Sequence, residues 1–232
     1  MQHAIRTRVA GGALALVTTA GLLALTAGQQ VGATQTAAST GIKAKAVKDI
    51  RGALARRGVT VAGRPVRAVV FDDANGRNLV VLSRTEGRGR ALPDEPYTRT
   101  ARVYADHFAT KAGRTRKLRA VRDGQIDCPA DITASFIPGT PKATDLDGDR
   151  VAEVTFAYTL ACRSDVSPVT FKLLMLENGR RYIVRGESWN FEGSDEYTVR
   201  LPFGKPEPAW AKWPAPFARH AKRAYHHWAD LG

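Results

Sequence analysis

Four carboxylates lie close together in one short stretch near the middle of the chain. The segment ATDLDGDRVAEVTF, residues 143–156, places them at positions one, three, five and nine of a tight loop: Asp145, Asp147, Asp149 and Glu153. The backbone carbonyl of Val151 is available at position seven. Ca²⁺ takes about six to eight oxygen ligands, and a curled loop turns alternate side chains inward to supply them. The spacing therefore predicts a calcium site made by these five residues.

Two positions of the segment depart from well-known calcium loops. Position twelve is Phe156, so the bidentate Glu of an EF-hand is absent. Position six is Arg150, although the turn requires a positive φ there, which costs a residue with a side chain about 1 kcal/mol. The guanidinium of Arg150 can also compete with an ion. A carboxylate-rich turn without metal therefore remains an alternative.

A catalytic metal is a further alternative, in which Asp145, Asp147 and Asp149 would serve a hydrolase acting on polysaccharide or phosphodiester. No G-x-S-x-G, H-E-x-x-H or glycine-rich phosphate loop occurs in the chain, and no Cys-His pairing is evident. Because no matching base or nucleophile accompanies the acids, we expect no catalytic residues.

Strand patterns flank the acidic segment on both sides. Apolar residues alternate with polar ones, as in half-buried strands: Ile132, Ala134 and Phe136, then Val154, Phe156, Tyr158 and Leu160. Antiparallel pairing about residue 145 places Ile132 opposite Tyr158 and Phe136 opposite Val154. The same register places Cys128 opposite Cys162, so the two patterns together predict both the strand pair and a disulfide.

Two further hairpins are indicated by Asn-Gly turns. Residues 66–71 and 79–84 flank Asn75-Gly76, and residues 170–177 and 180–186 flank Asn178-Gly179. Asp72 and Asp73 stand at the entry to the first turn, where Asp binds nearby backbone N–H groups, so we expect a turn role for them. Residues 116–124 read as another short strand.

Helical spacing of apolar residues predicts three helices. The first lies within residues 42–58 and ends at Gly58, and the second covers residues 97–112, with His107 at its surface or boundary. The third is an amphipathic C-terminal helix with Phe217, Ala221, Ala224, Tyr225, Trp228 and Leu231 on one face. The predicted fold is α+β: an antiparallel sheet of hairpins with amphipathic helices packed on one side, and one disulfide.

The N-terminal residues have the features of a secretory signal peptide. Arg6 and Arg8 precede an apolar run, and Val31-Gly32-Ala33 provides a cleavage site, so we assign residues 1–33 to this signal. Residues 34–41 are small and polar and are predicted to be a disordered linker. Residues 42–232 are predicted to form a single α+β domain. The mature chain then has no stable membrane span, and we expect it outside the cell or in the cell envelope, where two cysteines are usually joined.

The chain is strongly basic, with a formal net charge of +13. Loss of Arg6 and Arg8 with the signal peptide lowers this value by two, to +11. Such a surface attracts polyanions such as wall polymers, acidic glycans, anionic lipid or nucleic acid, although charge alone identifies no partner.

A wider segment combines these features in one order. It reads DCPADITASF, TDLDGDRVAEVTFAYTLACRSDVSPVTFKLLML and YIVRG. It resembles a family of small exported bacterial proteins labelled surface-polysaccharide-biosynthesis proteins. The acidic segment alone resembles the calcium loop of FG-GAP repeats and, more loosely, those of EF-hands and dockerins. The family resemblance implies a calcium-like loop at residues 145–153, a Cys128–Cys162 bridge and an envelope or extracellular location, and it brings no catalytic residues.

The function expected from the sequence is that of a secreted, non-enzymatic protein with a structural calcium loop. Its basic surface would bind an acidic polymer of the envelope or the extracellular space, such as an anionic polysaccharide. The alternatives are the metal-dependent hydrolase described above and a metal-free basic protein that binds a partner.

Overall fold

The structure, a computed structural model, describes residues 41–188 and 203–229. The predicted signal peptide, nearly all of the predicted linker and Leu231 of the predicted C-terminal helix lie outside these residues. None of the helices within the described ranges is long and apolar enough to cross a membrane.

The N-terminal part of the domain forms one antiparallel sheet. Its strands lie in sequence order: β1 (Lys45–Ala46), β2 (Arg64–Asp73), β3 (Gly76–Arg88), β4 (Arg99–Lys111) and β5 (Arg114–Cys128). The first predicted hairpin is confirmed as β2 and β3. Asp73 pairs with Gly76, so Ala74 and Asn75 form the turn, one residue earlier than predicted. Gly76 has a φ of 105°, and a Cβ there would collide with the carbonyl oxygen of Thr110.

The C-terminal part forms a second antiparallel sheet. Its strands are β6 (Asp131–Phe136), β7 (Lys142–Thr144), β8 (Glu153–Arg163), β9 (Val169–Glu177), β10 (Arg180–Ser188) and β11 (Lys205–Glu207). They lie in the order β11, β10, β9, β8, β6, and β7 pairs with β8 beside β6. Glu177 pairs with Arg180, which confirms the predicted two-residue turn at Asn178-Gly179.

The strands on either side of the acidic segment pair as predicted, but in a different register. Ile132 lies opposite Cys162, and Phe136 lies opposite Tyr158. The turn is longer than predicted and is centred near Gly148 instead of residue 145, because pairing resumes only at Thr144 and Glu153. Each β6 residue therefore pairs with a β8 residue four positions further along the chain than predicted. Since side chains alternate with a period of two, the same residues still face the same side.

The helix predicted for residues 97–112 is wrong, because this segment is strand β4. It lies between β3 and β5, and buried residues occupy both of its faces, among them Val103 on one and Phe108 on the other. A strand covered on both faces lacks a clean alternation, so its apolar residues also fit helical spacing. His107 belongs to this strand and is 1% exposed, so its predicted surface position is also wrong.

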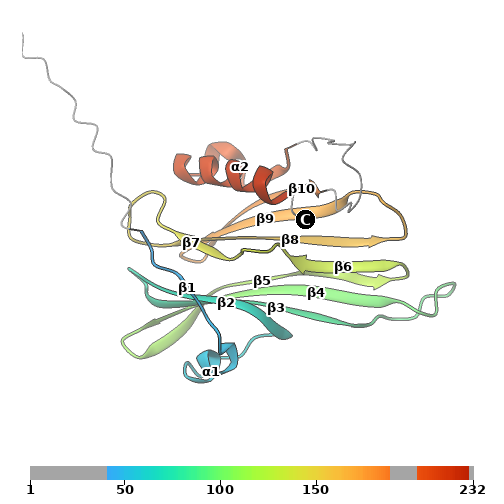
Figure 1. The fold of residues 1–232 in the computed structure, drawn as a ribbon, viewed down its shortest axis with the longest axis horizontal. Coiled ribbons are helices and arrows are strands. Elements are labelled where there is room, and N and C mark those ends of the chain that lie inside the picture. The colour runs from blue at the N-terminus through green and yellow to red at the C-terminus, as the bar shows by residue number, and fades with distance from the viewer. Residues whose placement is uncertain (1–40, 189–202, 230–232) are drawn as a thin grey trace, which may run out of the picture. The chain divides into compact units, whose positions relative to one another are not determined.

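Two facing sheets and a helix on the outer side of each form the layers of the fold (Figure 1). Three clusters of buried side chains fill the spaces between these layers. The largest lies between the two sheets and includes Phe71, Val80, Leu82, Val103, Phe136, Val154, Phe156, Tyr158, Leu174 and Leu176. A second cluster joins the outer face of the first sheet to α1 (Ile50–Ala55). The third joins the outer face of the second sheet to α2 (Ala215–Ala229), which follows the short 3-10 helix η1 (Trp210–Lys212).

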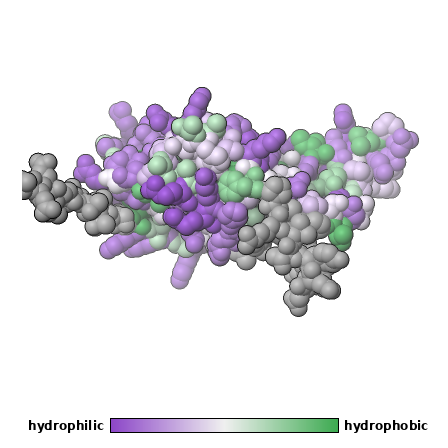
Figure 2. Space-filling view, turned by 90° about the horizontal axis from the view of Figure 1, so that it is seen from above, coloured by the Kyte–Doolittle hydropathy of each residue, from purple (hydrophilic) through white to green (hydrophobic). Residues whose placement is uncertain are grey.

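The α+β class with antiparallel hairpins is therefore confirmed, with two differences in detail. The strands form two facing sheets, and one helix covers the outer face of each sheet instead of both helices sharing one side. The predicted C-terminal helix is present, and Phe217, Ala221, Tyr225 and Trp228 are buried against the second sheet. The face that carries α2 is mainly hydrophilic, with hydrophobic residues in small separate spots (Figure 2).

Covalent and polar links join the two sheets around the core. The predicted disulfide Cys128–Cys162 is confirmed and connects the end of β5 to β8, with a Cα–Cα distance of 5.7 Å. Arg67 on β2 donates hydrogen bonds to three carbonyl oxygens at the end of β6 and just after it, those of Phe136, Ile137 and Thr140.

A partly buried ion pair adds a third link. Asp123 on β5 accepts hydrogen bonds from Tyr158 on β8 and Lys172 on β9, both at 2.6 Å. Burial opposes ionisation of Asp123, but the hydrogen bonds from Lys172 and Tyr158 outweigh it and lower the pKa of this carboxyl.

Loss of the disulfide is expected to destabilise the domain strongly. With cysteines 34 residues apart, Cys128→Ser with Cys162→Ser should lower the free energy of unfolding by about 3–4 kcal/mol, because the unfolded chain gains loop entropy. Urea unfolding with and without dithiothreitol measures this change. Reduction should lower the stability of the wild type to that of the variant and leave the variant unchanged. A loss below about 1 kcal/mol would contradict the assignment of this bridge as a main link between the sheets.

Candidate metal centre

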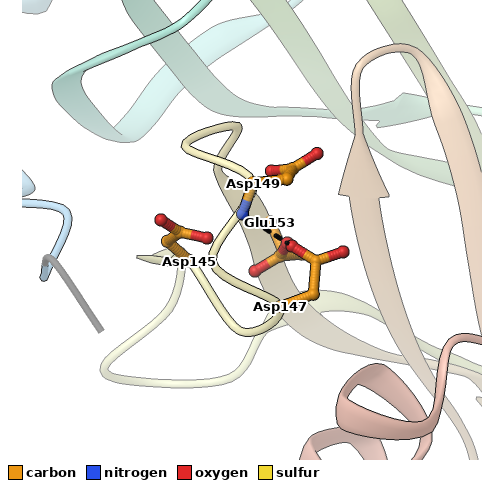
Figure 3. A group of neighbouring side chains, drawn as sticks. All are labelled: Asp145, Asp147, Asp149 and Glu153. Carbon is orange, nitrogen blue, oxygen red and sulfur yellow. Dashed lines mark hydrogen bonds between the residues drawn. The ribbon is translucent and has the colours of Figure 1, made fainter. Parts of the chain in front are cut away.

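The acidic segment forms the connection between β7 and β8, and its four carboxylates converge. The side chains project from this loop and from the first residue of β8 (Figure 3). One oxygen from each of Asp145, Asp147, Asp149 and Glu153 lies within 4.8 Å of the others. We call residues 145–153 the acid loop. The four predicted acidic ligands therefore lie together, and the cluster can hold a metal ion.

The loop is curled by its own carboxylates. The backbone amides of Gly148, Asp149 and Val151 donate hydrogen bonds to Asp145, Asp147 and Asp149, at 2.9, 3.3 and 2.7 Å respectively. Each bond returns the chain after two or three residues, in the manner of an Asx turn. This geometry explains the alternate spacing of the acids, because every second side chain is drawn toward the inside of the loop.

Two residues of the loop adopt left-handed backbone conformations. Gly148 has a φ of 81°, and Arg150 has a φ of 67°, the positive value that the loop pattern requires at position six. Arg150 therefore carries strain of about 1 kcal/mol. Within the described part of the chain it forms no ion pair with the acids, so its guanidinium does not occupy the centre of the cluster.

Two of the acids are buried with oxygens that lack a partner. Asp145 is 5% exposed and Glu153 is fully buried, whereas Asp147 and Asp149 are exposed. Oε2 of Glu153 accepts a hydrogen bond from the amide of Leu146 at 2.8 Å. Among the residues that the structure describes, Oε1 of Glu153 and Oδ2 of Asp145 have no hydrogen-bond partner. A buried carboxylate oxygen without a partner is costly, and a cation at the cluster would satisfy both of these oxygens.

The negative charges of the cluster are close enough to raise the pKa of Glu153. Burial raises the pKa of Glu153 to about 8, the amide of Leu146 opposes this rise, and the charges of Asp147 and Asp145 add to it. In the protein without metal, burial and the neighbouring charges therefore favour a proton on Glu153, and a bound cation would displace it.

A fifth carboxylate lies beside the cluster. Glu177 on β9 pairs with Glu153 across the sheet. Burial raises the pKa of Glu177, and the charges of Asp147 and Asp149 raise it further. The sequence pattern did not identify this residue, because it belongs to another strand. The only signal was its place directly before the Asn178-Gly179 turn, which sets the register of β9 and β10 but not that of β9 and β8.

The turn between β2 and β3 holds the acid loop from the first sheet. Asp73 accepts a hydrogen bond from the amide of Ala152 at 3.1 Å, and the amide of Ala74 donates to the carbonyl oxygen of Arg150 at 2.8 Å. Asp73 also accepts from the amide of Asn75 at 2.7 Å, which is the predicted turn role. Its contact with the acid loop spans 79 residues of sequence and was not predicted.

Two buried polar residues, Asn78 and His107, hold Asp73 in place through a series of hydrogen bonds. The amide group of Asn78 donates to Asp73 at 2.7 Å, and the amide oxygen of Asn78 lies 2.9 Å from Nε2 of His107. Burial lowers the pKa of His107 to about 4, although the charge of Asp73 opposes this shift. His107 is therefore neutral at pH 7, and Nε2 carries the proton that it donates to Asn78.

A cleft of about 880 Å³ opens beside the acid loop. It is lined by Gly41, Ile42, Lys43, Asp72, Asp73, Ala74, Asp145 and Arg150. The cluster is thus reached from solvent both through its exposed acids and past the buried Asp145.

Comparisons of the chain with protein-family models, with curated proteins and with solved structures each give no match. The resemblance to exported surface-polysaccharide-biosynthesis proteins therefore stays a prediction.

The contact between Asp73 and the acid loop leads to a prediction with an adjacent control. Asp73→Ala should lower the free energy of unfolding by roughly 2 kcal/mol, because it leaves the amides of Ala152 and Asn75 without their acceptor. Asp72→Ala removes the same charge from an exposed neighbour and should change stability by less than about 0.5 kcal/mol. Urea unfolding compares the two variants. Equal effects would show that the loop does not depend on this turn.

Proposed function

We propose that this is a secreted, non-enzymatic protein in which the acid loop binds Ca²⁺ as a structural ion and the basic surface binds an acidic envelope or extracellular polymer. The observation that carries the calcium part is the pair of buried carboxylate oxygens without partners, in Asp145 and Glu153, inside a cluster of four acids.

The donor set favours Ca²⁺ over other common metals. The cluster offers only oxygen atoms, which suit hard cations, whereas Zn²⁺ and Cu²⁺ sites usually include nitrogen or sulfur ligands. Mg²⁺ requires near-ideal octahedral geometry and retains several waters, while Ca²⁺ accepts irregular loops and more ligands. The carbonyl of Val151 and water at the exposed Asp147 and Asp149 would complete the coordination.

The position of the loop favours a structural role. It closes the pairing of β7 with β8 and is held by Asp73 from the other sheet, so its conformation is coupled to both halves of the core. Without a cation, the charged carboxylates of the cluster repel one another at this junction, and Glu153 is left buried with a raised pKa. An ion that binds the folded loop and not the unfolded chain stabilises the fold by mass action.

Secretion is supported by the N-terminal sequence and by the disulfide. Residues 1–33 have the charge pattern and cleavage site of a signal peptide. Disulfides persist in oxidising compartments, and the bridge between Cys128 and Cys162 suits such a location.

Binding of an acidic polymer is supported by the charge of the chain and by its distribution. The formal net charge is +13, and exposed basic residues occur on several elements, including Lys45 on β1 and Arg77 on β3. A surface of this charge attracts polyanions, and their affinity falls as salt screens the interaction.

A metal-dependent hydrolase is the second candidate, and one observation favours it. A catalytic metal keeps an open coordination position that faces a cleft, and the cleft beside Asp145 would provide that access. Asp72, Asp73 and Arg150 also line this cleft. Release of product from a polysaccharide or phosphodiester substrate, dependent on metal and abolished by Asp145→Asn, would decide for this candidate.

Calcium should raise the thermal stability of the protein. At a concentration one hundred times Kd, binding to the folded state contributes about 2.7 kcal/mol, which corresponds to a Tm increase on the order of 5–10 °C for a domain of this size. Differential scanning calorimetry in EDTA and in millimolar Ca²⁺ measures this increase. Mg²⁺ at the same concentration should give a smaller one.

Variants of the two exposed acids provide the control. Asp147→Asn with Asp149→Asn keeps the oxygens that accept backbone amides but removes two negative charges. This variant should lose most of the response to Ca²⁺, while Asp94→Asn, an exposed acid on another loop, should keep it. If wild type responds to neither EDTA nor Ca²⁺, the acid loop is a polar turn without metal.

A further inference from the structure

A basic pocket lies on the outer face of the first sheet, away from the acid loop. Its volume is about 530 Å³, which falls within the range typical of sites for small ligands. Its apolar lining includes Val47, Ala53 and Val70, which belong to the cluster that packs α1 on this sheet. Thr110 on β4 also lines it.

Five basic side chains line this pocket, and they come from separate elements. Lys45 and Lys48 belong to β1 and the residues after it, Arg56 and Arg57 follow α1, and Arg77 belongs to β3. The acid in the lining is Asp49, whose side chain is largely exposed. It accepts a hydrogen bond from the amide of Gly52 at 2.8 Å and lies 3.8 Å from the guanidinium of Arg56.

The remaining basic groups lack negative partners. Among the ion pairs of the described residues, none includes Lys45, Lys48, Arg57 or Arg77. Arg57 donates a hydrogen bond to the carbonyl oxygen of Ala53 at 3.0 Å, and its buried Nε finds no partner within residues 41–188 and 203–229. A buried guanidinium nitrogen beside unpaired cations is the counterpart of the buried oxygens in the acid loop.

The positive charges around Arg57 are close enough to repel one another. Burial lowers the pKa of Arg57, and the charges of Arg77 and Arg56 lower it further. Arginine nevertheless stays protonated at neutral pH, so the repulsion remains in the folded protein. An oxyanion would relieve it, because a guanidinium offers parallel N–H donors that match the oxygens of a carboxylate, sulfate or phosphate group.

The surroundings of the pocket favour a chain-like ligand over a single ion. Lys48 and Asp49 also line an adjoining hollow of about 260 Å³, whose other lining residues are Ile50, Arg51, Arg64 and Pro65. Two further arginines therefore continue the basic surface past the pocket. A polymer with regularly spaced anionic groups would contact both hollows at once.

We propose that the pocket beneath α1 binds one anionic sugar unit of an acidic polysaccharide, with Arg57 and Arg77 as the main ligands of its carboxylate or of its sulfate or phosphate ester. This inference rests on the proposed function and locates it. The apolar lining suits the C–H face of a sugar ring, and the adjoining hollow accommodates the next unit.

The test measures the affinity of the purified protein for defined polymers. The probes are hyaluronate, which bears carboxylates, and dextran sulfate, which bears sulfate esters, with neutral dextran and inorganic polyphosphate for comparison. Binding is measured by biolayer interferometry at two salt concentrations. The pocket variant is Arg57→Gln with Arg77→Gln. The control variant is Arg219→Gln with Arg223→Gln, which removes the same charge from exposed positions on α2.

The pocket variant should bind its preferred polysaccharide at least tenfold more weakly than wild type, and the control variant less than threefold more weakly. Because Arg57 donates to Ala53, Arg77→Gln alone is measured as well. It should retain the wild-type melting temperature and still lose affinity about threefold or more.

The contrary outcomes are distinct. Equal weakening of the pocket and control variants would overturn the pocket and leave the proposed function in place, since diffuse charge would then carry the binding. Absence of binding by wild type to both acidic polysaccharides would overturn the proposed polymer binding itself. Equally tight binding of polyphosphate would overturn the assignment to a sugar unit.

Discussion

Repulsion among the carboxylates of the acid loop is the constraint around which this part of the fold is arranged. Two of the four acids are buried, and each has an oxygen without a hydrogen-bond partner in the part of the chain that the structure describes. The loop reduces the repulsion only in part, by directing carboxylate oxygens at its own backbone amides. Hydrogen bonds of this kind cannot neutralise a cluster of charges, whereas a divalent cation can. In our proposal the ion is therefore a component of the folded state.

The same loop lies where the two sheets meet, so its state bears on the whole domain. Asp73 reaches it from the first sheet, and β7 and β8 hold its ends in the second. The disulfide and the partly buried pair of Asp123 with Lys172 join the sheets elsewhere. The opposite imbalance occurs in the basic pocket beneath α1. The unpaired acids of the acid loop and the unpaired bases of the pocket thus lie at separate places among the described residues. We propose that a cation binds the first and an anionic polymer the second.

The sequence was most informative where the relevant residues are neighbours in the chain. Alternate acids identified the cluster before the fold was known, and the alternation beside Cys128 and Cys162 identified the disulfide, although the register was four residues off. Strand β4 was missed because apolar residues on both of its faces also fit helical spacing. The contacts of Asp73 and Glu177 with the acid loop were missed because they depend on pairing between distant strands, which no local pattern encodes.

The most direct test of calcium binding by the acid loop is a structure from crystals of the protein grown in the presence of Ca²⁺. Our account predicts an ion with anomalous signal at the acid loop, about 2.3–2.6 Å from oxygens of Asp145, Asp147, Asp149 and Glu153 and from the carbonyl oxygen of Val151. The buried oxygens of Asp145 and Glu153 should both be ligands. A water molecule or the guanidinium of Arg150 at this position, in saturating Ca²⁺, would contradict the account.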